Sequence, residues 1–439
     1  MTDVEPARAP AGLDVGDVVT VEVGPVAHGG HCVARHGPAA QVMFVRHALP
    51  GERVRALVTE QGPGGRYVRA DAVEVLDASA DRVTPPCPYA GPGRCGGCDW
   101  QHAGLAAQRE LKATVVTEQL LRLGGLTPQE VAALGVRCEP VPGDTEGLGW
   151  RTRVEVAVDR RRDGSTVTGL RRHRSHEVVP LDRCLIAHPG VDTTRVLGGP
   201  PPPAPVVALD IVAPSAGEPV VVPLVPPRRP RGATRRGARH TPVPAGPVPE
   251  VTERVGDHRF TLSARGFWQV HPGAAATFTA QVLTWLAPQA GERALDLYAG
   301  VGLFAVPLAE AVGPTGSVLA VEADRTAAAS AARHLDDRPW AEAVAEPSER
   351  ALERLVDRGE RADVVVLDPP RSGAGRGVVA AIAALHPRAV VYVACDPAAL
   401  ARDLRTAREH GLELVELRVL DAFPMTHHVE CLALLRPHA

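Results

Sequence analysis

Two reactive side chains stand close to the end of the chain: Cys395, in VYVACDPAAL, and Glu430, in THHVECLALL. A cysteine thiolate is a nucleophile and a carboxylate can act as a general base, so the two together could perform covalent chemistry on a pyrimidine ring. A lone cysteine is more often a small buried hydrophobic residue, and the residue alone leaves this alternative open. Cys395 directly precedes Asp396-Pro397, where a helix is predicted to begin, and a helix N-terminus would favour the thiolate.

About a hundred residues upstream, the run RALDLYAGVGLFAVPLA predicts a buried strand, a glycine turn and the start of a helix. Nucleotide-like cofactors are commonly held by this arrangement, and Gly300 and Gly302 would let the backbone approach a ligand. The third glycine of the dinucleotide fingerprint is absent, so an ordinary tight turn is an equal alternative. Glu322 follows the next predicted strand and could accept hydrogen bonds from ribose hydroxyls, and Asp368 follows a later strand in LDPPR.

The elements that must position these residues lie in the second half of the chain. From roughly Phe260, strands and helices alternate, which predicts a doubly wound α/β sheet. In such a sheet, ligands gather outside the carboxyl ends of the parallel strands. The last strand has a short connection to the one before it, so we expect it to be antiparallel and to carry Glu430 toward Cys395. The predicted strands are 293–298, 317–321, 363–367, 389–393, 412–420 and 428–436.

The first half of the chain predicts two further β-rich parts. Short β-rich runs between Val15 and Leu76 indicate a small five-stranded barrel of the oligonucleotide-binding kind, with a barrel used only for assembly as the alternative. A helix is predicted over Leu105 to Leu123, and strand-like segments from Trp150 to about Pro180 indicate a β-rich central domain. Residues 199–250 are dense in proline and contain RRPRGATRRGARH, so they are predicted to be a loop or linker without a core.

Charge and hydropathy narrow the class of protein. The chain has 439 residues and a net charge of -3, so no global basic field indicates a nucleic-acid partner, and a local basic stripe would have to supply one. There is no charged-then-apolar leader and no apolar span of transmembrane length, so the expected location is the cytoplasm and no membrane is expected as a partner. Candidates for a basic stripe, with solvated ion pairs as the alternative, are Arg151, Arg153, Arg160, Arg161, Arg162, Arg171, Arg172 and Arg174.

Four of the eight cysteines could form a metal site. Cys87, Cys95 and Cys98 lie in CPYAGPGRCGGC, and Cys184 lies in PLDRCLIAHP. Four thiolates accept either zinc or a 4Fe-4S cluster, and unligated thiols are the third possibility. The spacing C-x7-C-x2-C fits no standard zinc knuckle.

Jointly, six motifs resemble the S-adenosylmethionine-dependent RNA uridine-5-methyltransferases, particularly the bacterial 23S rRNA branch with an N-terminal TRAM domain. The motifs are FWQV (Gln269), DLYAGVG, VEAD (Glu322), DPPR (Asp368), ACDP (Cys395) and HVEC (Glu430). They occur in the family's order, and the resemblance extends from about residue 13 to the end with a gap in the proline-rich stretch. The segments GPVAHGGHCVAR and YVRADAVEVL resemble a TRAM domain, an RNA-binding barrel.

The resemblance implies a fold and a division of the chain. The fold class is α/β, with a class I Rossmann-like methyltransferase domain, an N-terminal OB-like TRAM barrel and a β-rich central domain. The expected parts are a tail (1–12), the TRAM barrel (13–77), the central domain (78–259) with an insertion at about 199–250, and the methyltransferase domain (260–439).

The resemblance also implies a reaction. Cys395 would add to carbon 6 of a uridine in RNA, a methyl group would be transferred to carbon 5, and Glu430 would remove the proton left there. The cofactor pocket would include Gln269, Tyr298, Gly300, Gly302, Glu322 and Asp368. The expected partner is RNA, with 23S rRNA preferred over tRNA, and the protein is expected to act as a monomer. Rival functions are tRNA methylation, methylation of an exocyclic amine, and a catalytically silent RNA-binding protein in ribosome assembly.

The resemblance further implies that the four cysteines, Cys87, Cys95, Cys98 and Cys184, hold a 4Fe-4S cluster with a structural or RNA-positioning role. Two positions depart from the family pattern: Leu303 and His271 stand where many members have asparagine, so no role is carried over to them. Arg371, next to the DPP turn, could pair with an RNA phosphate or form a local salt bridge.

Overall fold

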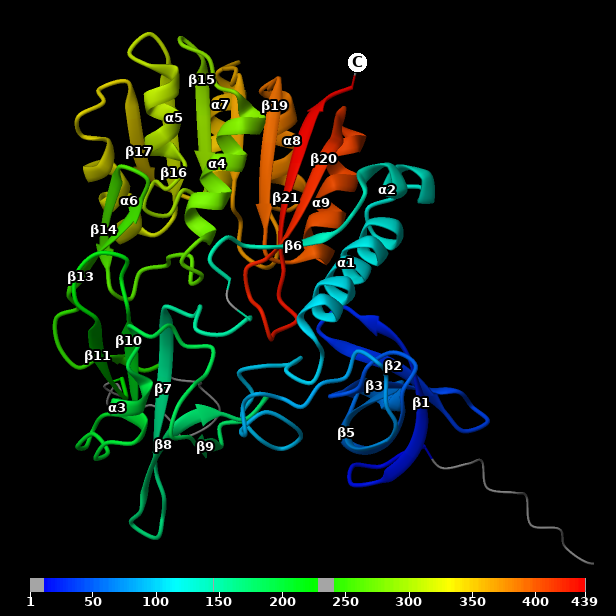
Figure 1. Ribbon diagram of the computed structural model, residues 1–439. Helices are drawn as coiled ribbons and strands as arrows, with labels where there is room; N and C mark the ends of the chain where they lie inside the picture. The colour runs from blue at the N-terminus through cyan, green and yellow to red at the C-terminus, as the bar shows by residue number, and fades with distance from the viewer. Residues whose placement is uncertain (1–11, 145, 228–240, 439) are drawn as a thin grey trace, which may run out of the picture.

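The computed structural model describes residues 12–144, 146–227 and 241–438. A closed five-stranded barrel occupies one corner of the molecule, coloured blue in Figure 1. Alternate residues of its strands, such as Val54, Ala56 and Val58 of β4, are buried and fill the interior. The predicted barrel is therefore confirmed. Its strands, which close in the order β1-β2-β3-β5-β4, are β1 Val18–Ala27, β2 His31–His36, β3 Gln41–Arg46, β4 Arg53–Gln61 and β5 Tyr67–Asp77, with a 3₁₀ turn at Pro63–Gly65.

A six-stranded sheet forms the central part of the chain, in the order β12-β11-β10-β7-β8-β9. The prediction that 199–250 carries no core is wrong, because β10 and β11 lie inside this stretch and Ala208 and Leu224 are fully buried. The apolar runs ALDIV and VVVPLV pair with each other despite the prolines around them. The arginine run at 228–240 lies outside the described residues. The strands are β7 Arg153–Arg160, β8 Thr166–Arg171, β9 Val178–Pro180, β10 Ala208–Val212, β11 Val220–Val225 and β12 Val243–Pro244; a separate hairpin joins β13 Glu250–Val255 to β14 His258–Ser263.

The second half of the chain forms most of an eight-stranded sheet, in the order β17-β16-β15-β18-β19-β21-β20-β6. The first five are parallel, and β21 is antiparallel to both β19 and β20, as predicted. Two strands were not predicted: β17, and β6, which comes from the first half of the chain and extends the sheet beside β20. The strands are β15 Arg293–Leu297, β16 Ser317–Glu322, β17 Ala341–Ala345, β18 Val364–Leu367, β19 Ala389–Ala394, β20 Leu412–Asp421, β21 Glu430–Pro437 and β6 Cys138–Pro140.

Helices cover both faces of this sheet, which gives the doubly wound architecture (Figure 1). One face packs on α4 Ala274–Leu286, α5 Ala305–Val312 and α6 Arg325–Leu335. The other packs on α7 Ser348–Asp357, α8 Arg376–Ala384 and α9 Pro397–Glu409.

The predicted amphipathic helix is α1 Leu105–Arg122, which leads from the barrel to the edge of the large sheet and packs on α9. Two short helices, α2 Pro128–Leu134 and α3 Thr193–Leu197, complete the described helices. No helix in the described ranges has the length and apolar character needed to cross a membrane.

Candidate active site and cysteine cluster

Cys395 and Glu430 lie opposite each other at the carboxyl edge of the parallel strands. In the antiparallel pairing of β19 with β21, Ala394 faces Cys431, and the next positions in this register are Cys395 and Glu430. Directly opposite residues of an antiparallel pair point to the same face of a sheet. Cys431 points to the other face, where it is fully buried among apolar residues, as the alternation of a strand predicts.

The surroundings of Cys395 are acidic. Burial and, to a smaller extent, the carboxyls of Glu430 and Asp368 raise the pKa of its thiol to about 12, and the Arg371 guanidinium opposes them. The start of α9 was predicted to favour the thiolate, whereas the surroundings of Cys395 favour the protonated thiol. The helix does begin after Asp396, but the Asp396 side chain accepts the Ala399 backbone N–H and places a negative charge beside the sulfur. Desolvation and carboxylates outweigh the helix N-terminus.

Glu430 and Asp368 share one low-polarity environment. Glu430 is 4% exposed, and its Oε2 atom has no hydrogen-bond partner among the described residues. Burial raises the pKa of Glu430 well above its ordinary value, and Asp368 adds to the shift. Burial also raises the pKa of Asp368 to about 7. A carboxylate with a raised pKa binds a proton more strongly, which suits Glu430 to the role of a general base.

The loop after β15 has the conformation of a ligand-binding turn. Tyr298, Gly300 and Gly302 have positive φ angles of 59°, 56° and 88°. Residues other than glycine rarely adopt such angles. At the end of β16, the carboxylate of Glu322 accepts the Gly300 N–H at 2.9 Å and the Asp324 N–H at 2.7 Å. Glu322 therefore holds the loop in shape, and each of its oxygens keeps a lone pair for a further donor.

Asp296 is a residue that the sequence interpretation missed. It lies within β15, is completely buried, and has no hydrogen-bond partner at either carboxylate oxygen in the described part of the chain. Burial raises its pKa well above the ordinary value, the Ala305 backbone N–H opposes the shift, and Asp368 and Glu322 add to it. The available signal was an acidic residue between two leucines in the buried part of the strand RALDL. A buried carboxyl without a partner indicates a site that a cationic or hydrogen-bonding ligand would complete.

Gln269 lies in the segment between β14 and α4, which hydrogen bonds from Thr152, the residue before β7 of the central sheet, hold in place. The Thr152 backbone N–H and hydroxyl both donate to the Val270 carbonyl, each at 2.9 Å. Gln269 itself is buried. Phe267, two residues earlier, is 73% exposed, although the chain has few aromatic residues. The sequence interpretation assigned no role to Phe267; the signal for it was an aromatic residue directly before the Trp268-Gln269 pair.

His271 is buried and stacks on Trp150, with ring centroids 6.3 Å apart. Its Nδ1 atom accepts the Gly273 N–H at 3.1 Å, while its Nε2 atom has no partner in the described structure. Burial lowers the pKa of His271, so the ring is neutral at physiological pH.

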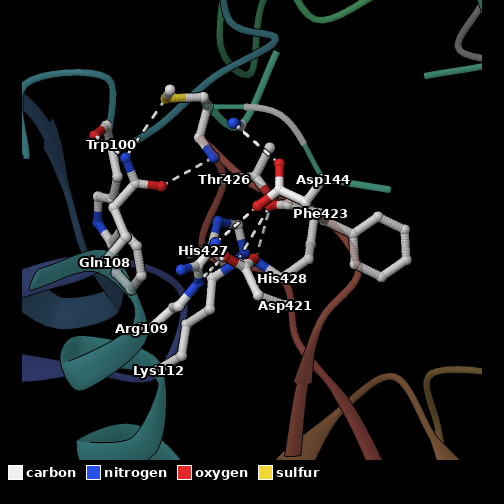
Figure 2. Close-up of polar contacts among 12 residues, drawn as sticks. Trp100, Gln108, Arg109, Lys112, Asp144, Asp421, Phe423, Thr426, His427 and His428 are labelled. Atoms are coloured by element: carbon white, nitrogen blue, oxygen red, sulfur yellow. Dashed lines mark hydrogen bonds and ion pairs between the residues drawn. The ribbon is translucent and has the colours of Figure 1, made fainter. Parts of the chain in front are cut away.

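The loop between β20 and β21 carries Glu430 into place and is held by α1 (Figure 2). Asp421 at the start of the loop pairs with the buried ammonium of Lys112 and, at 3.3 Å, with Arg109. Lys112 also donates to the Phe423 carbonyl at 3.0 Å. The Gln108 side chain accepts the Met425 N–H at 2.8 Å.

Two histidines of this loop make contacts near the site. His427 Nδ1 lies 2.7 Å from Asp99, and His428 Nε2 lies 3.3 Å from Arg371. Burial, together with the nearby His427 and Arg371, lowers the pKa of His428 to about 3. His428 is therefore a neutral partner of Arg371. Arg371 makes a local contact in this structure, and it is the cation that opposes the acidic groups around Cys395.

The four clustered cysteines, Cys87, Cys95, Cys98 and Cys184, line one cavity of about 270 Å³. Gln101 braces it, because its amide donates to Cys98 Sγ at 3.2 Å and accepts the Cys87 N–H at 3.0 Å. Burial raises the pKa of Cys95 to about 11 and also raises the pKa values of Cys98 and Cys184.

No three His, Cys, Asp or Glu side chains in the described ranges are arranged to hold one metal ion. A single zinc ion with Zn–S distances near 2.3 Å would require the thiols to move closer together. The structure by itself therefore does not support the expected 4Fe-4S cluster, although it brings the four thiols to one cavity.

Most arginines of the candidate basic stripe make local contacts. Arg153 is largely buried against Glu253, and Arg151 lines the cysteine cavity. Arg161 and Arg162, at the tip of the β7–β8 hairpin, are exposed and make no side-chain hydrogen bond or ion pair with a described residue. Local pairing thus accounts for most of the stripe. The remaining pairs are Arg171 with Glu155, Arg172 with Glu177 and Arg174 with Glu60, while Arg160 donates to the carbonyls of Pro202 and Val206.

Comparison with known proteins gives a consistent result. A family model described as tRNA (Uracil-5-)-methyltransferase matches residues 252–438, and a TRAM domain model matches residues 13–73. A Streptomyces coelicolor protein named as an uncharacterized RNA methyltransferase is 48% identical, over 99% of this chain and 96% of its own length. The 23S rRNA (uracil(1939)-C(5))-methyltransferase RlmD of Pseudomonas aeruginosa is 34% identical, over 98% of this chain and 96% of its own length.

A solved structure has the same overall fold. The tRNA (uracil-54, C5)-methyltransferase of Pyrococcus abyssi, in complex with S-adenosyl-L-homocysteine, aligns with a TM-score of 0.65. The alignment covers 94% of this chain and 99% of that chain at 20% sequence identity.

Proposed function

Because the chain belongs to the RNA (uracil-5-)-methyltransferase family, we propose that it transfers a methyl group from S-adenosylmethionine to carbon 5 of a uridine in 23S rRNA. The observation that carries this proposal is the antiparallel pairing of β19 with β21, which puts Glu430 opposite Cys395. A nucleophile and a base on one face of the sheet can act on the same pyrimidine ring.

The proposed reaction divides the work between the two side chains. The Cys395 sulfur, after losing its proton, forms a bond to carbon 6 of the uracil, and the ring's electron pair becomes available at carbon 5. As carbon 5 forms its new bond to the methyl group, the bond from that group to the donor sulfur would break, its electron pair would stay on the sulfur, and the donor would leave as a neutral thioether. Carbon 5 then carries both the methyl group and its original proton. Glu430 accepts this proton, the double bond between carbons 5 and 6 is restored, and the sulfur departs as a thiolate.

The residues at the carboxyl edge of the sheet fit a cationic methyl donor. S-adenosylmethionine supplies an electrophilic methyl group on a positively charged sulfur. Asp296, buried without a partner, and Asp368, with its raised pKa, would be stabilised by a neighbouring positive charge. The same charge would offset the carboxyls that keep Cys395 protonated. The further residues proposed to hold the donor are Gln269, Tyr298, Gly300, Gly302 and Glu322.

The RNA must present an unstacked uridine, because addition to carbon 6 requires access to the face of the ring. Phe267 supports this requirement, since an exposed aromatic ring close to Gln269 offers a surface on which a base can stack. The barrel at residues 13–73, matched by the TRAM model, is proposed to bind RNA away from the target base.

The 4Fe-4S cluster is also part of the proposal, with Cys87, Cys95, Cys98 and Cys184 as its ligands. It is supported by the order of the four cysteines, although two extra residues separate Cys87 from Cys95, and by the shared cavity. Binding of iron would stabilise the thiolates and release their protons. Its proposed role is structural, because Asp99, directly after Cys98, contacts His427 in the loop that leads to Glu430.

The function is tested by methyl transfer from radiolabelled S-adenosylmethionine to unmodified transcripts of 23S rRNA and of tRNA. We expect label in 23S rRNA, in 5-methyluridine. Cys395→Ala should reduce transfer to background while donor affinity, measured by calorimetry, stays within about twofold. Label in the tRNA arm alone would reject the rRNA substrate, and turnover by Cys395→Ala would reject the covalent route.

A further inference from the structure

The barrel reaches the active site through the turn between β1 and β2. His28 directly follows β1, and its Nε2 atom lies 3.0 Å from Asp396 Oδ2, although 368 residues separate the two in sequence. Asp396 is the residue after Cys395 and the N-cap of α9. A barrel side chain therefore contacts the N-cap of α9, the residue that directly follows Cys395.

The same turn also contacts the loop that leads to Glu430. Trp100 Nε1 donates to the Gly30 carbonyl at 3.0 Å. A Cβ atom at Gly30 would lie 2.5 Å from His427 Cβ, and Gly30 has a φ angle of +79°. The turn is therefore packed so closely on His427 that only glycine fits at this position.

Ion pairs next to this contact link the barrel to the cysteine segment and to the β20–β21 loop. Arg46 of β3 lies 3.5 Å from Asp99, which in turn pairs with His427 at 2.7 Å. The pKa of Asp99 is held well below its ordinary value by its hydrogen bond and ion pair with His427 and by Arg46, against the effect of burial. The barrel, the cysteine segment and the catalytic loop thus form one connected polar network.

We propose that His28 is a positioning residue for Cys395: its hydrogen bond to Asp396 fixes the start of α9 and with it the direction of the sulfur. This inference rests on the proposed function of Cys395. His28 itself does not touch the reacting atoms. Asp396 has two tasks, since Oδ1 accepts the Ala399 N–H at 2.8 Å while Oδ2 accepts from His28. Without His28, the Asp396 carboxylate would still cap α9 through Oδ1, but it would lose the contact at Oδ2 that fixes the rotation of the side chain.

The test measures how fast Cys395 forms a covalent adduct. A 23S rRNA transcript made with 5-fluorouridine should trap the adduct, because fluorine at carbon 5 cannot be removed as a proton. We expect His28→Ala to slow adduct formation about tenfold, the loss typical of one hydrogen bond to a charged group. His28→Gln keeps an N–H donor at a similar reach and should stay within about threefold of the wild-type rate.

Two controls separate positioning from stability and from RNA affinity. His36→Ala changes another barrel histidine, which makes no side-chain hydrogen bond or ion pair with a described residue, and should match the wild type. The Kd for RNA should be unchanged in His28→Ala. In an Asp396→Asn background, His28→Ala should cost less than it does alone, because the charged partner is already gone.

The outcomes distinguish this inference from the proposed function. A wild-type protein that forms no adduct overturns both. A wild-type adduct together with a wild-type rate in His28→Ala overturns only the role of His28. An equal loss in His28→Gln and His28→Ala, or a loss accounted for by weaker RNA binding, overturns it as well.

Discussion

Cys395, the proposed nucleophile, has surroundings that disfavour the thiolate. Its thiol has a raised pKa because it is partly buried and lies near the carboxyls of Glu430 and Asp368. A free thiolate would be open to oxidation and alkylation, whereas a protonated thiol is inert. Activation must therefore come with a change in local charge, and binding of a cationic donor beside Asp368 would supply one.

The charge state of Cys395 can be measured by alkylation with iodoacetamide, followed by mass spectrometry of its peptide. Because only the thiolate reacts, a pKa of about 12 predicts a rate that rises about tenfold per pH unit from pH 7 to 10 with no plateau. Asp368→Asn removes a negative neighbour, lowers the pKa of Cys395 and should speed alkylation about tenfold at pH 8. Asp357 is exposed, so Asp357→Asn is the matched control and should leave the alkylation rate of Cys395 unchanged. A rate that reaches a plateau near pH 8 in the wild type would contradict the raised pKa.

The proposed role of Glu430 as the base can be tested by whether the protein–RNA adduct is released. Glu430→Gln preserves shape but cannot accept the proton at carbon 5, so a protein–RNA adduct should accumulate on denaturing gels while product release falls to background. The exposed Glu353→Gln serves as the control and should release product normally. An adduct that persists in the double variant Cys395→Ala with Glu430→Gln would show that another residue is the nucleophile.

At the scale of elements, α1 and the β20–β21 loop behave as one unit (Figure 2). Lys112 of α1 is completely buried, and Asp421 and the Phe423 carbonyl accept from its ammonium group. Arg109 bridges Asp421 to Asp144. A buried charge is tolerated only when it is paired, so these contacts specify one position for the loop that ends at Glu430.

This network predicts unequal effects of removing its members. Asp421→Asn leaves the buried Lys112 without a carboxylate and should lower the free energy of unfolding by about 3–5 kcal/mol in urea denaturation. Lys112→Met should cost less, because Asp421 keeps its ion pair with Arg109. Asp257→Asn, on the exposed turn between β13 and β14, is the control. Equal losses in the two core variants would show that Arg109 does not compensate for Lys112.

At the scale of the whole molecule, the parts of the chain meet around the active site. The barrel contacts Asp396 through His28, the cysteine segment contacts His427 through Asp99, and the central sheet anchors the segment of Gln269. The candidate active site at the edge of the large sheet is therefore contacted by all parts of the chain, and the cysteine segment contacts both the barrel and the β20–β21 loop.

The cysteine segment provides a test at this scale. Protein purified without oxygen should contain about four iron atoms per chain and absorb visible light. Cys98→Ser should lose the iron and slow methyl transfer, whereas Cys138→Ser, whose cysteine lies apart in β6, should keep both. Because the thiols must be deprotonated, iron loading should weaken as pH falls. Zinc without iron in the isolated protein would overturn the iron–sulfur proposal.

The sequence by itself determined the barrel, the doubly wound sheet and the antiparallel last strand, because alternation, glycine turns and strand–helix order are local patterns. It missed β17, whose alanine- and glutamate-rich residues have weak strand preference, and it missed β10 and β11, whose short apolar runs are surrounded by prolines.

Only the tertiary structure decided the features that depend on distant segments. β6 pairs with β20 although the two lie far apart in sequence, and His28 meets Asp396. The pKa of the Cys395 thiol is raised because the thiol is partly buried and Glu430 and Asp368 lie near it. A motif states which residue types are present, whereas a pKa or a hydrogen bond depends on burial and on neighbours that lie far away in sequence. Long-range packing therefore controls how the predicted side chains behave.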